Sequence, residues 1–117
     1  MKNILLVDDA LFMRYALRLM LEPMGHNIVG EASNGRDAVN LFKRVKPDLV
    51  LMDITMPELD GLGALKEIML IDATAKVIMI SAMGRELIIR EAILLGAKGF
   101  IVKPFVEKTV LKVLEKM

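Results

Sequence analysis

ILLVDD, residues 4–9, sets four consecutive apolar residues directly before two aspartates. A short continuous apolar run of this kind is typical of a strand that is buried on both faces of a parallel sheet. The pattern recurs in LVLMD, residues 49–53, and in FIVK, residues 100–103. Because parallel strands present their carboxyl ends at one edge of the sheet, where open α/β folds bind ligands, we expect the charged residues that end these runs to meet there.

Apolar runs alternate with segments of helical periodicity along the chain, which predicts an α/β fold with a doubly wound, five-stranded parallel sheet. The expected strands are residues 3–7, 28–32, 49–53, 77–81 and 100–103, and the expected helices are residues 11–21, 62–70, 85–95 and 106–115, with one more that ends before Pro47. The 117 residues are the size of one ordinary domain, so we expect a single domain over residues 1–117.

Composition narrows the classes of function. The net charge of +1 gives no reason to expect binding to nucleic acid or to a membrane surface. Asp8 and Asp9 interrupt the first apolar run, and no stretch approaches the ~18 apolar residues that span a bilayer, so a cytoplasmic location is expected. The absence of Cys and the single His, His26, disfavour thiolate or imidazole metal clusters and hydrolytic triads.

The charged strand ends predict a site for a hard cation and a phosphoryl group. Burying an unpaired carboxylate is costly, so Asp8 and Asp9 must face the crevice at the sheet edge, although either one alone could equally be a helix cap. If Asp53 lies beside them, the three acids repel one another unless a cation such as Mg²⁺ is present. Asp53 could then be a nucleophile for phosphorus, with Ser81 and Lys103 supplying a hydroxyl and an ammonium to phosphoryl oxygens.

These residues resemble the receiver domains of bacterial two-component signalling, and most closely the single-domain response regulators of chemotaxis. The matching stretches are residues 4–10 with Met13 and Arg14, residues 52–57 with Asp60 and Gly61, Ser81 with Ala82, and residues 103–105. The resemblance covers the whole chain and implies a flavodoxin-like fold with five helices and strand order 2-1-3-4-5, an order taken from the family. It also implies a signalling switch that catalyses only its own aspartyl phosphorylation and dephosphorylation.

The resemblance assigns a role to each acidic residue. Asp53 would be the phosphoacceptor. Asp9 and Asp53 would bind Mg²⁺ directly, together with the backbone carbonyl of Thr55, and Asp8 would act through water. Lys103 would pair with the carboxylate or the phosphoryl group, and its peptide bond to Pro104 would be cis.

Two further positions of the family carry the signal outward. Ser81 fills the place of the switch hydroxyl, and Phe100 fills that of an aromatic switch residue whose packing reports the phosphorylated state. The helix expected over residues 85–95 has more apolar residues than one buried stripe needs, so Ile89 and Ile93 could lie near Phe100 and bind a partner helix. A broad stripe that faces only the core would explain the same residues equally well.

The resemblance also implies partners. The phosphodonor would be a histidine kinase of the CheA type, the output partner a protein such as the flagellar motor switch, and a phosphatase could act on a monomeric regulator. Thr55 and Met83 flank the path of an attacking water in the family. Neither is a strong acid or base, so we expect slow self-hydrolysis.

Other functions remain open at this point. A receiver could instead serve a phosphorelay, or be cut from a transcription factor or a methylesterase, although the chain begins just before the first strand and ends in the last helix. A phosphatase of the haloacid dehalogenase type would place a second acid where Thr55 stands. Flavin binding is disfavoured, because the loop at residues 8–11 is acidic where a phosphate cradle would offer hydroxyl groups.

Overall fold

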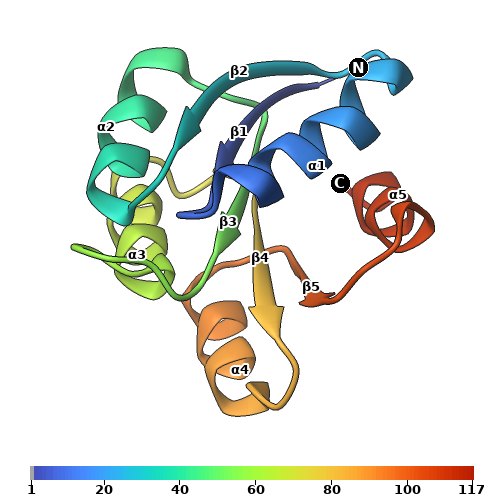
Figure 1. The fold of residues 1–117 in the computed structure, drawn as a ribbon. Coiled ribbons are helices and arrows are strands. Elements are labelled where there is room, and N and C mark those ends of the chain that lie inside the picture. Colours follow the sequence, from blue (N-terminus) through green and yellow to red (C-terminus); the bar gives the residue numbers. More distant parts are fainter. Residues whose placement is uncertain (1) are drawn as a thin grey trace.

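A parallel sheet of five strands forms the centre of the molecule in a computed structural model, which describes residues 2–117 (Figure 1). The strands are β1 (Asn3–Val7), β2 (Asn27–Ala32), β3 (Leu49–Asp53), β4 (Val77–Ala82) and β5 (Gly99–Lys103). Their order in the sheet is β2-β1-β3-β4-β5, which confirms the order that the family resemblance implied. Each neighbouring pair is parallel, so all five carboxyl ends lie along one edge.

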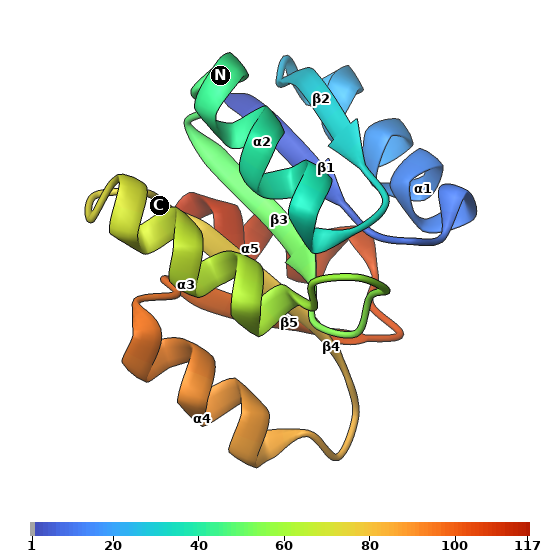
Figure 2. The ribbon, with the colours of Figure 1, turned by 90° about the vertical axis from the view of Figure 1, so that its left-hand side faces the viewer.

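Helices cover both faces of this sheet. They are α1 (Leu11–Leu21), α2 (Gly35–Val45), α3 (Gly61–Ile71), α4 (Glu86–Leu95) and α5 (Glu107–Glu115), and a short 3₁₀ helix, η1 (Glu22–Met24), follows α1. The helices α2, α3 and α4 lie on one face, and α1 and α5 lie on the other (Figures 1 and 2). In residues 2–117 no helix is both long and apolar enough to cross a membrane.

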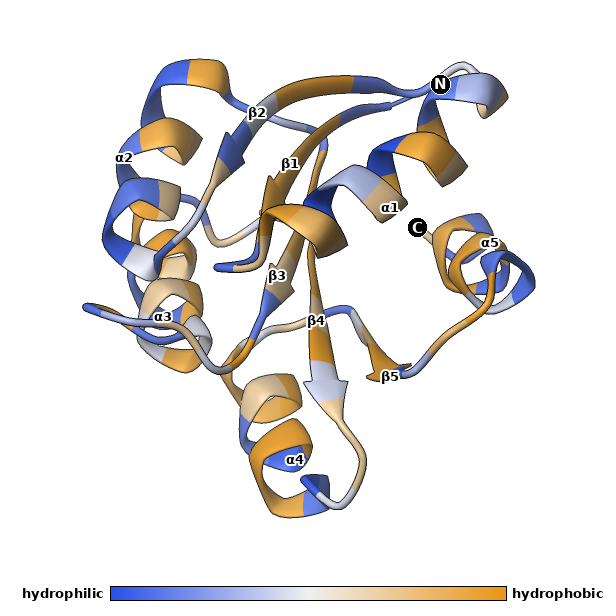
Figure 3. Ribbon diagram, viewed as in Figure 1, coloured by the Kyte–Doolittle hydropathy of each residue, from blue (hydrophilic) through white to orange (hydrophobic). Residues whose placement is uncertain are grey.

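The alternation of side chains along the strands divides the core into two layers. In β1, Leu5 and Val7 belong to the layer under α2, α3 and α4, whereas Ile4 and Leu6 belong to the layer under α1 and α5. All four are fully buried or nearly so, and burial of each such side chain is worth about 1.5–3 kcal/mol. The strands are accordingly apolar along their length in Figure 3, and polar residues gather at their ends.

The expected helices and strands agree with the structure to within one residue at each predicted boundary. After α1 the chain forms one further turn, η1, which was not among the expected elements. Pro23 is accepted in the first turn of η1, and Gly25 closes that turn with a φ of 93° while its N–H donates to the Glu22 carbonyl at 3.0 Å.

Candidate functional site

The turn between β1 and α1 holds two adjacent acids in different environments. Asp8 is 1% exposed, and its Oδ1 accepts a hydrogen bond from the Ala10 N–H at 2.9 Å. Its own N–H donates to the Ala32 carbonyl at 3.0 Å, which ties the turn to β2. Asp9 is exposed. The N-cap of α1 is Ala10, with no side-chain cap bond, so the alternative in which one of these acids caps the helix is wrong.

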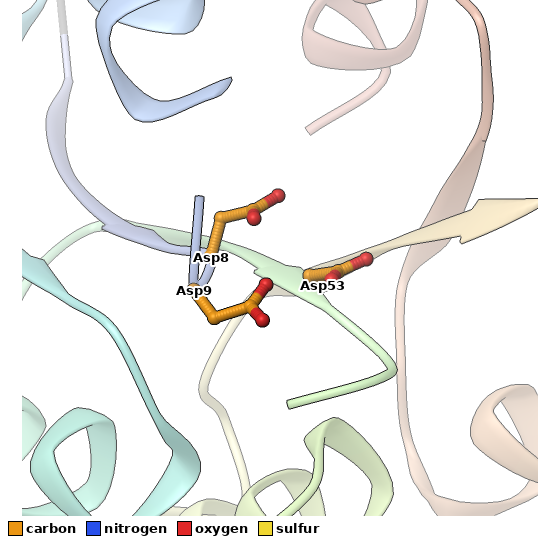
Figure 4. A group of neighbouring side chains, drawn as sticks. All are labelled: Asp8, Asp9 and Asp53. Carbon is orange, nitrogen blue, oxygen red and sulfur yellow. The ribbon is translucent and has the colours of Figure 1, made fainter. Parts of the chain in front are cut away.

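Asp53 joins these two acids because β3 lies next to β1. The pairing of Val7 with Met52 brings the ends of the two strands together. Asp8, Asp9 and Asp53 each offer a carboxylate oxygen within 4.8 Å of the others, and the three side chains point to the same side in Figure 4. The predicted convergence of the three carboxylates is therefore present in the structure.

Lys103 reaches this acidic cluster from the end of β5. Its Nζ atom lies 3.2 Å from Oδ2 of Asp8 and 3.2 Å from Oδ1 of Asp53. The peptide bond from Lys103 to Pro104 is cis, as the resemblance implied. One ammonium group thus contacts two of the three carboxylates, and the cluster keeps an excess of negative charge.

The same charges perturb the titration of both groups. Burial raises the pKa of Asp53, and the negative charge of Asp8 raises it further, against the opposing effect of Lys103. Burial alone would lower the pKa of Lys103, but the carboxylates of Asp53 and Asp8 outweigh it, and the pKa lies above its ordinary value. A cation placed among these acids would relieve the repulsion, and an all-oxygen donor set at an open edge fits a hard divalent ion such as Mg²⁺.

The loop after β3 is held against the site by Gly61. The Gly61 N–H donates to the Ile54 carbonyl at 2.7 Å, and a Cβ at residue 61 would overlap the carbonyl oxygen of Asp53. Asp60 caps α3 by accepting from the Gly63 N–H at 2.8 Å, and Thr55 is exposed in the same loop. In the sequence, Asp60 and Gly61 stand out only as part of a motif that the family shares. The signal for their roles is the Asp-Gly pair directly before a helix.

The other predicted residues lie toward β4 and β5. Ser81 is buried, at 2% exposure, and its hydroxyl donates to the Ala82 carbonyl at 3.0 Å. Met83 is 73% exposed just beyond β4. Phe100 is 45% exposed, so its ring lies at the surface of the molecule.

A groove of about 600 Å³ runs between α4 and β5, and Ile89, Ile93 and Phe100 all line it. Ala92 is the buried residue of α4, whereas Leu87 and Leu94 are exposed to more than three quarters of their surface. The alternative in which the apolar residues of α4 all face the core is therefore wrong. Three residues predicted to share a surface do share one.

Arg14 is a contact of the site to which the sequence analysis gave no role. Its Nη1 donates to the main-chain carbonyl of Asp8 at 2.6 Å. The sequence shows only that an arginine lies in the first turns of α1. Its partner is a main-chain carbonyl, and a pattern of side chains does not reveal a contact of that kind.

Comparison with known proteins agrees with this geometry. The sequence model of the response regulator receiver domain family matches residues 4–115 of this chain. The chemotaxis protein CheY of Thermotoga maritima is 53% identical over 116 residues, which cover 99% of this chain and 97% of the relative. CheY of Bacillus subtilis is 54% identical over 114 residues, which cover 97% of this chain and 95% of the relative.

Among solved structures, the CheX-CheY-BeF₃-Mg²⁺ complex from Borrelia burgdorferi contains a similar chain. The TM-score is 0.94 at 40% identity, and the match covers 97% of this chain and 87% of that chain. The likeness therefore extends over both the sheet and the helices.

Proposed function

The chain belongs to the response regulator receiver domain family, and from that premise we propose that it is a phosphorylatable switch of two-component signalling. Asp53 accepts a phosphoryl group from the phosphohistidine of a histidine kinase, and the surface formed by α4, β5 and α5 then binds an output partner. The protein catalyses its own phosphorylation and dephosphorylation and has no external substrate to turn over.

The position of Lys103 carries the proposal. Its ammonium lies at the same 3.2 Å distance from Asp53 and from Asp8, and Asp9 completes a cluster in which acids outnumber the base. An ion pair that only stabilises the fold needs one carboxylate for each ammonium, so the additional carboxylates point to a binding site. An ammonium within reach of the acceptor carboxylate is placed to contact a phosphoryl oxygen once that group is attached.

The transfer step uses the Asp53 carboxylate as nucleophile. One of its oxygens bonds to phosphorus while the bond from phosphorus to the donor nitrogen breaks, and the donor imidazole keeps that electron pair. The product is an acyl phosphate on Asp53. Lys103 then neutralises part of the charge on the phosphoryl oxygens, because its long side chain can follow them as they replace the carboxylate.

Mg²⁺ is the cofactor that fits the site. Asp9 and Asp53 would hold it directly, the Thr55 carbonyl would be a further ligand, and Asp8 would act through water. When bound, the ion screens the negative charge of the carboxylates and of the incoming phosphoryl group. The complex of the Borrelia burgdorferi relative, which contains Mg²⁺, supports this assignment.

The output step depends on Ser81 and Phe100. The new phosphoryl oxygens can accept a hydrogen bond from the Ser81 hydroxyl, which now donates to the Ala82 carbonyl. Movement of Ser81 frees space beside β5 into which the exposed Phe100 ring can turn. The groove lined by Ile89 and Ile93 then changes shape, and a partner that prefers one shape shifts the population toward it.

The chemotaxis relatives favour a particular setting for this switch. We infer a cytoplasmic regulator whose phosphodonor is a CheA-like kinase and whose output partner is a flagellar motor switch protein. A phosphatase that reaches Asp53 would end the signal. Both CheY relatives are chemotaxis proteins, and the match covers 97% and 95% of their chains, which supports this setting.

The test is the intact mass of the protein after incubation with acetyl phosphate, with and without Mg²⁺. The wild type should gain one phosphoryl group only with Mg²⁺, and Asp53→Asn should gain none. Asp48→Asn is the matched control, because Asp48 precedes the opposite end of the same strand and its replacement should leave the adduct unchanged. No adduct on the wild type, or an equal adduct on Asp53→Asn, would reject the proposal.

A further inference from the structure

Arg14 connects the acidic turn to the edge strand β2. Its Nη1 donates to the Asp8 carbonyl at 2.6 Å, and its Nε donates to Oε1 of Glu31 at 2.9 Å. The side chain is 14% exposed, so the guanidinium is enclosed between one partner in the turn after β1 and one in β2. Arg14 uses two different nitrogens of its planar guanidinium for these two acceptors, whereas a lysine would have to reach both from a single nitrogen.

Glu31 is itself held in place from the other side. Arg18 donates to Oε2 of Glu31 through Nη2 at 2.5 Å and Nε at 3.2 Å, and its Nη1 donates to Glu22 at 2.7 Å. Each carboxylate oxygen of Glu31 thus accepts hydrogen bonds from a different arginine. The hydrogen bond from Arg18 is the main reason that the pKa of Glu31 lies below its ordinary value. The anchor for Arg14 is a fixed carboxylate.

The carbonyl that Arg14 contacts belongs to the peptide unit between Asp8 and Asp9. A peptide unit is planar, so fixing its oxygen fixes the direction in which the chain leaves toward Asp9. Asp8 is already fixed by burial and by the Ala10 N–H, but Asp9 is exposed and lacks the support of a packed surrounding.

We propose that Arg14 is a positioning residue for the cation site, an inference that rests on the proposed function. Held by Glu31, it orients the peptide between Asp8 and Asp9 so that the Asp9 carboxylate meets Asp53 at cation-binding distance. Replacement of a residue that hydrogen-bonds to a metal ligand and fixes its orientation commonly lowers metal affinity by 10–100-fold.

Two roles of Arg14 predict opposite results, which makes the inference testable. If Arg14 acted only as a nearby positive charge, its removal would strengthen binding of a cation. If it positions the turn, its removal weakens binding. Mg²⁺ affinity of the unphosphorylated protein, measured by calorimetry, separates the two without any phosphorylation assay.

Arg14→Gln should weaken Mg²⁺ binding by about tenfold, at the lower end of the range for such residues because the contact is to a main-chain atom. Arg14→Lys, which keeps the charge and one of the two contacts, should fall between this variant and the wild type. Arg36→Gln is the matched control. It breaks an exposed pair with Glu67 on the other face, and should leave Mg²⁺ affinity unchanged.

Amide hydrogen exchange of Ala10 without Mg²⁺ gives an independent measure of the turn, because its N–H donates to Asp8. It should be faster in Arg14→Gln and unchanged in Arg36→Gln, with both variants folded by circular dichroism. Unchanged or tighter Mg²⁺ binding in Arg14→Gln, or unchanged Ala10 exchange, would overturn the inference while leaving Asp53 chemistry intact. A wild type that binds no Mg²⁺ would overturn the metal assignment as well.

Discussion

Gly61 packs directly against the carbonyl oxygen of Asp53, in the place where any other residue would put a Cβ atom. The Gly61 N–H also donates to the neighbouring Ile54 carbonyl at 2.7 Å. The main chain of Asp53 and the loop that leads into α3 therefore approach more closely than a side chain at residue 61 would permit. The site depends on a residue that has no side chain.

Gly61→Ala should destabilise the protein and displace Asp53 together. Main-chain atoms cannot move aside cheaply, so we expect a loss of about 1–3 kcal/mol in the free energy of unfolding and weaker Mg²⁺ binding. Gly25→Ala is the control, since residue 25 has open space around a Cβ and only its left-handed φ of 93° opposes the change. If Gly61→Ala and Gly25→Ala bound Mg²⁺ with the same affinity, the close packing of Gly61 against the Asp53 carbonyl would not matter to the cation site.

Lys103→Met should lower stability in a way that Mg²⁺ reverses. Asp8 and Asp53 are both buried, and loss of their shared ammonium leaves two carboxylates without their cationic partner, at a cost of about 1–3 kcal/mol. Mg²⁺ should bind more tightly to the variant, because a competing positive charge is gone, and should recover most of the loss. Denaturation by urea with and without Mg²⁺ measures both effects. An equal loss under the two conditions would contradict this account.

Met83→Glu should shorten the lifetime of the acyl phosphate. If residue 83 flanks the path of an attacking water, as the family resemblance implies, a carboxylate there can orient or deprotonate that water, whereas the thioether of Met83 can do neither. We expect hydrolysis to be roughly 10-fold faster, less than a fixed general base provides, because residue 83 is 73% exposed. Decay of the phosphorylated mass after removal of the donor measures the rate. A decay in Met83→Glu that matched Met83→Gln would show that the charge has no effect.

The sequence alone was sufficient for the strands and for the convergence of Asp8, Asp9 and Asp53, because continuous apolar runs with charged ends are a local pattern. It was not sufficient for the order of the strands, which came from the family, since an apolar run does not reveal its neighbours. Nor does a local pattern reveal contacts to main-chain atoms. This is why Arg14 and Gly61 appeared only as members of motifs, although both touch the strand ends that hold the acids.

His26 should make the protein less stable as the pH falls below neutrality. Its Nδ1 accepts a hydrogen bond from the Lys2 N–H at 3.1 Å, and a protonated imidazole has no lone pair for that bond. Burial lowers the pKa of His26 below its ordinary value of 6.5, with the charge of Lys2 adding to the effect. The unfolded chain therefore takes up this proton first. The stabilising effect is complete above about pH 6.5, is lost as the pH falls through the lower folded-state pKa, and does not change further below it.

The titration can be followed directly, because His26 is the single histidine of the chain and its ring proton signal in NMR needs no assignment. We expect a midpoint below 6.5 in the folded protein. Asn can still accept from the Lys2 N–H but does not titrate, so His26→Asn should lose less stability than the wild type between pH 7 and the folded-state midpoint. A midpoint at 6.5 would mean that His26 gives no pH dependence of stability, and a midpoint above 6.5 would mean that folding favours the charged ring, so that the predicted dependence has the opposite sign.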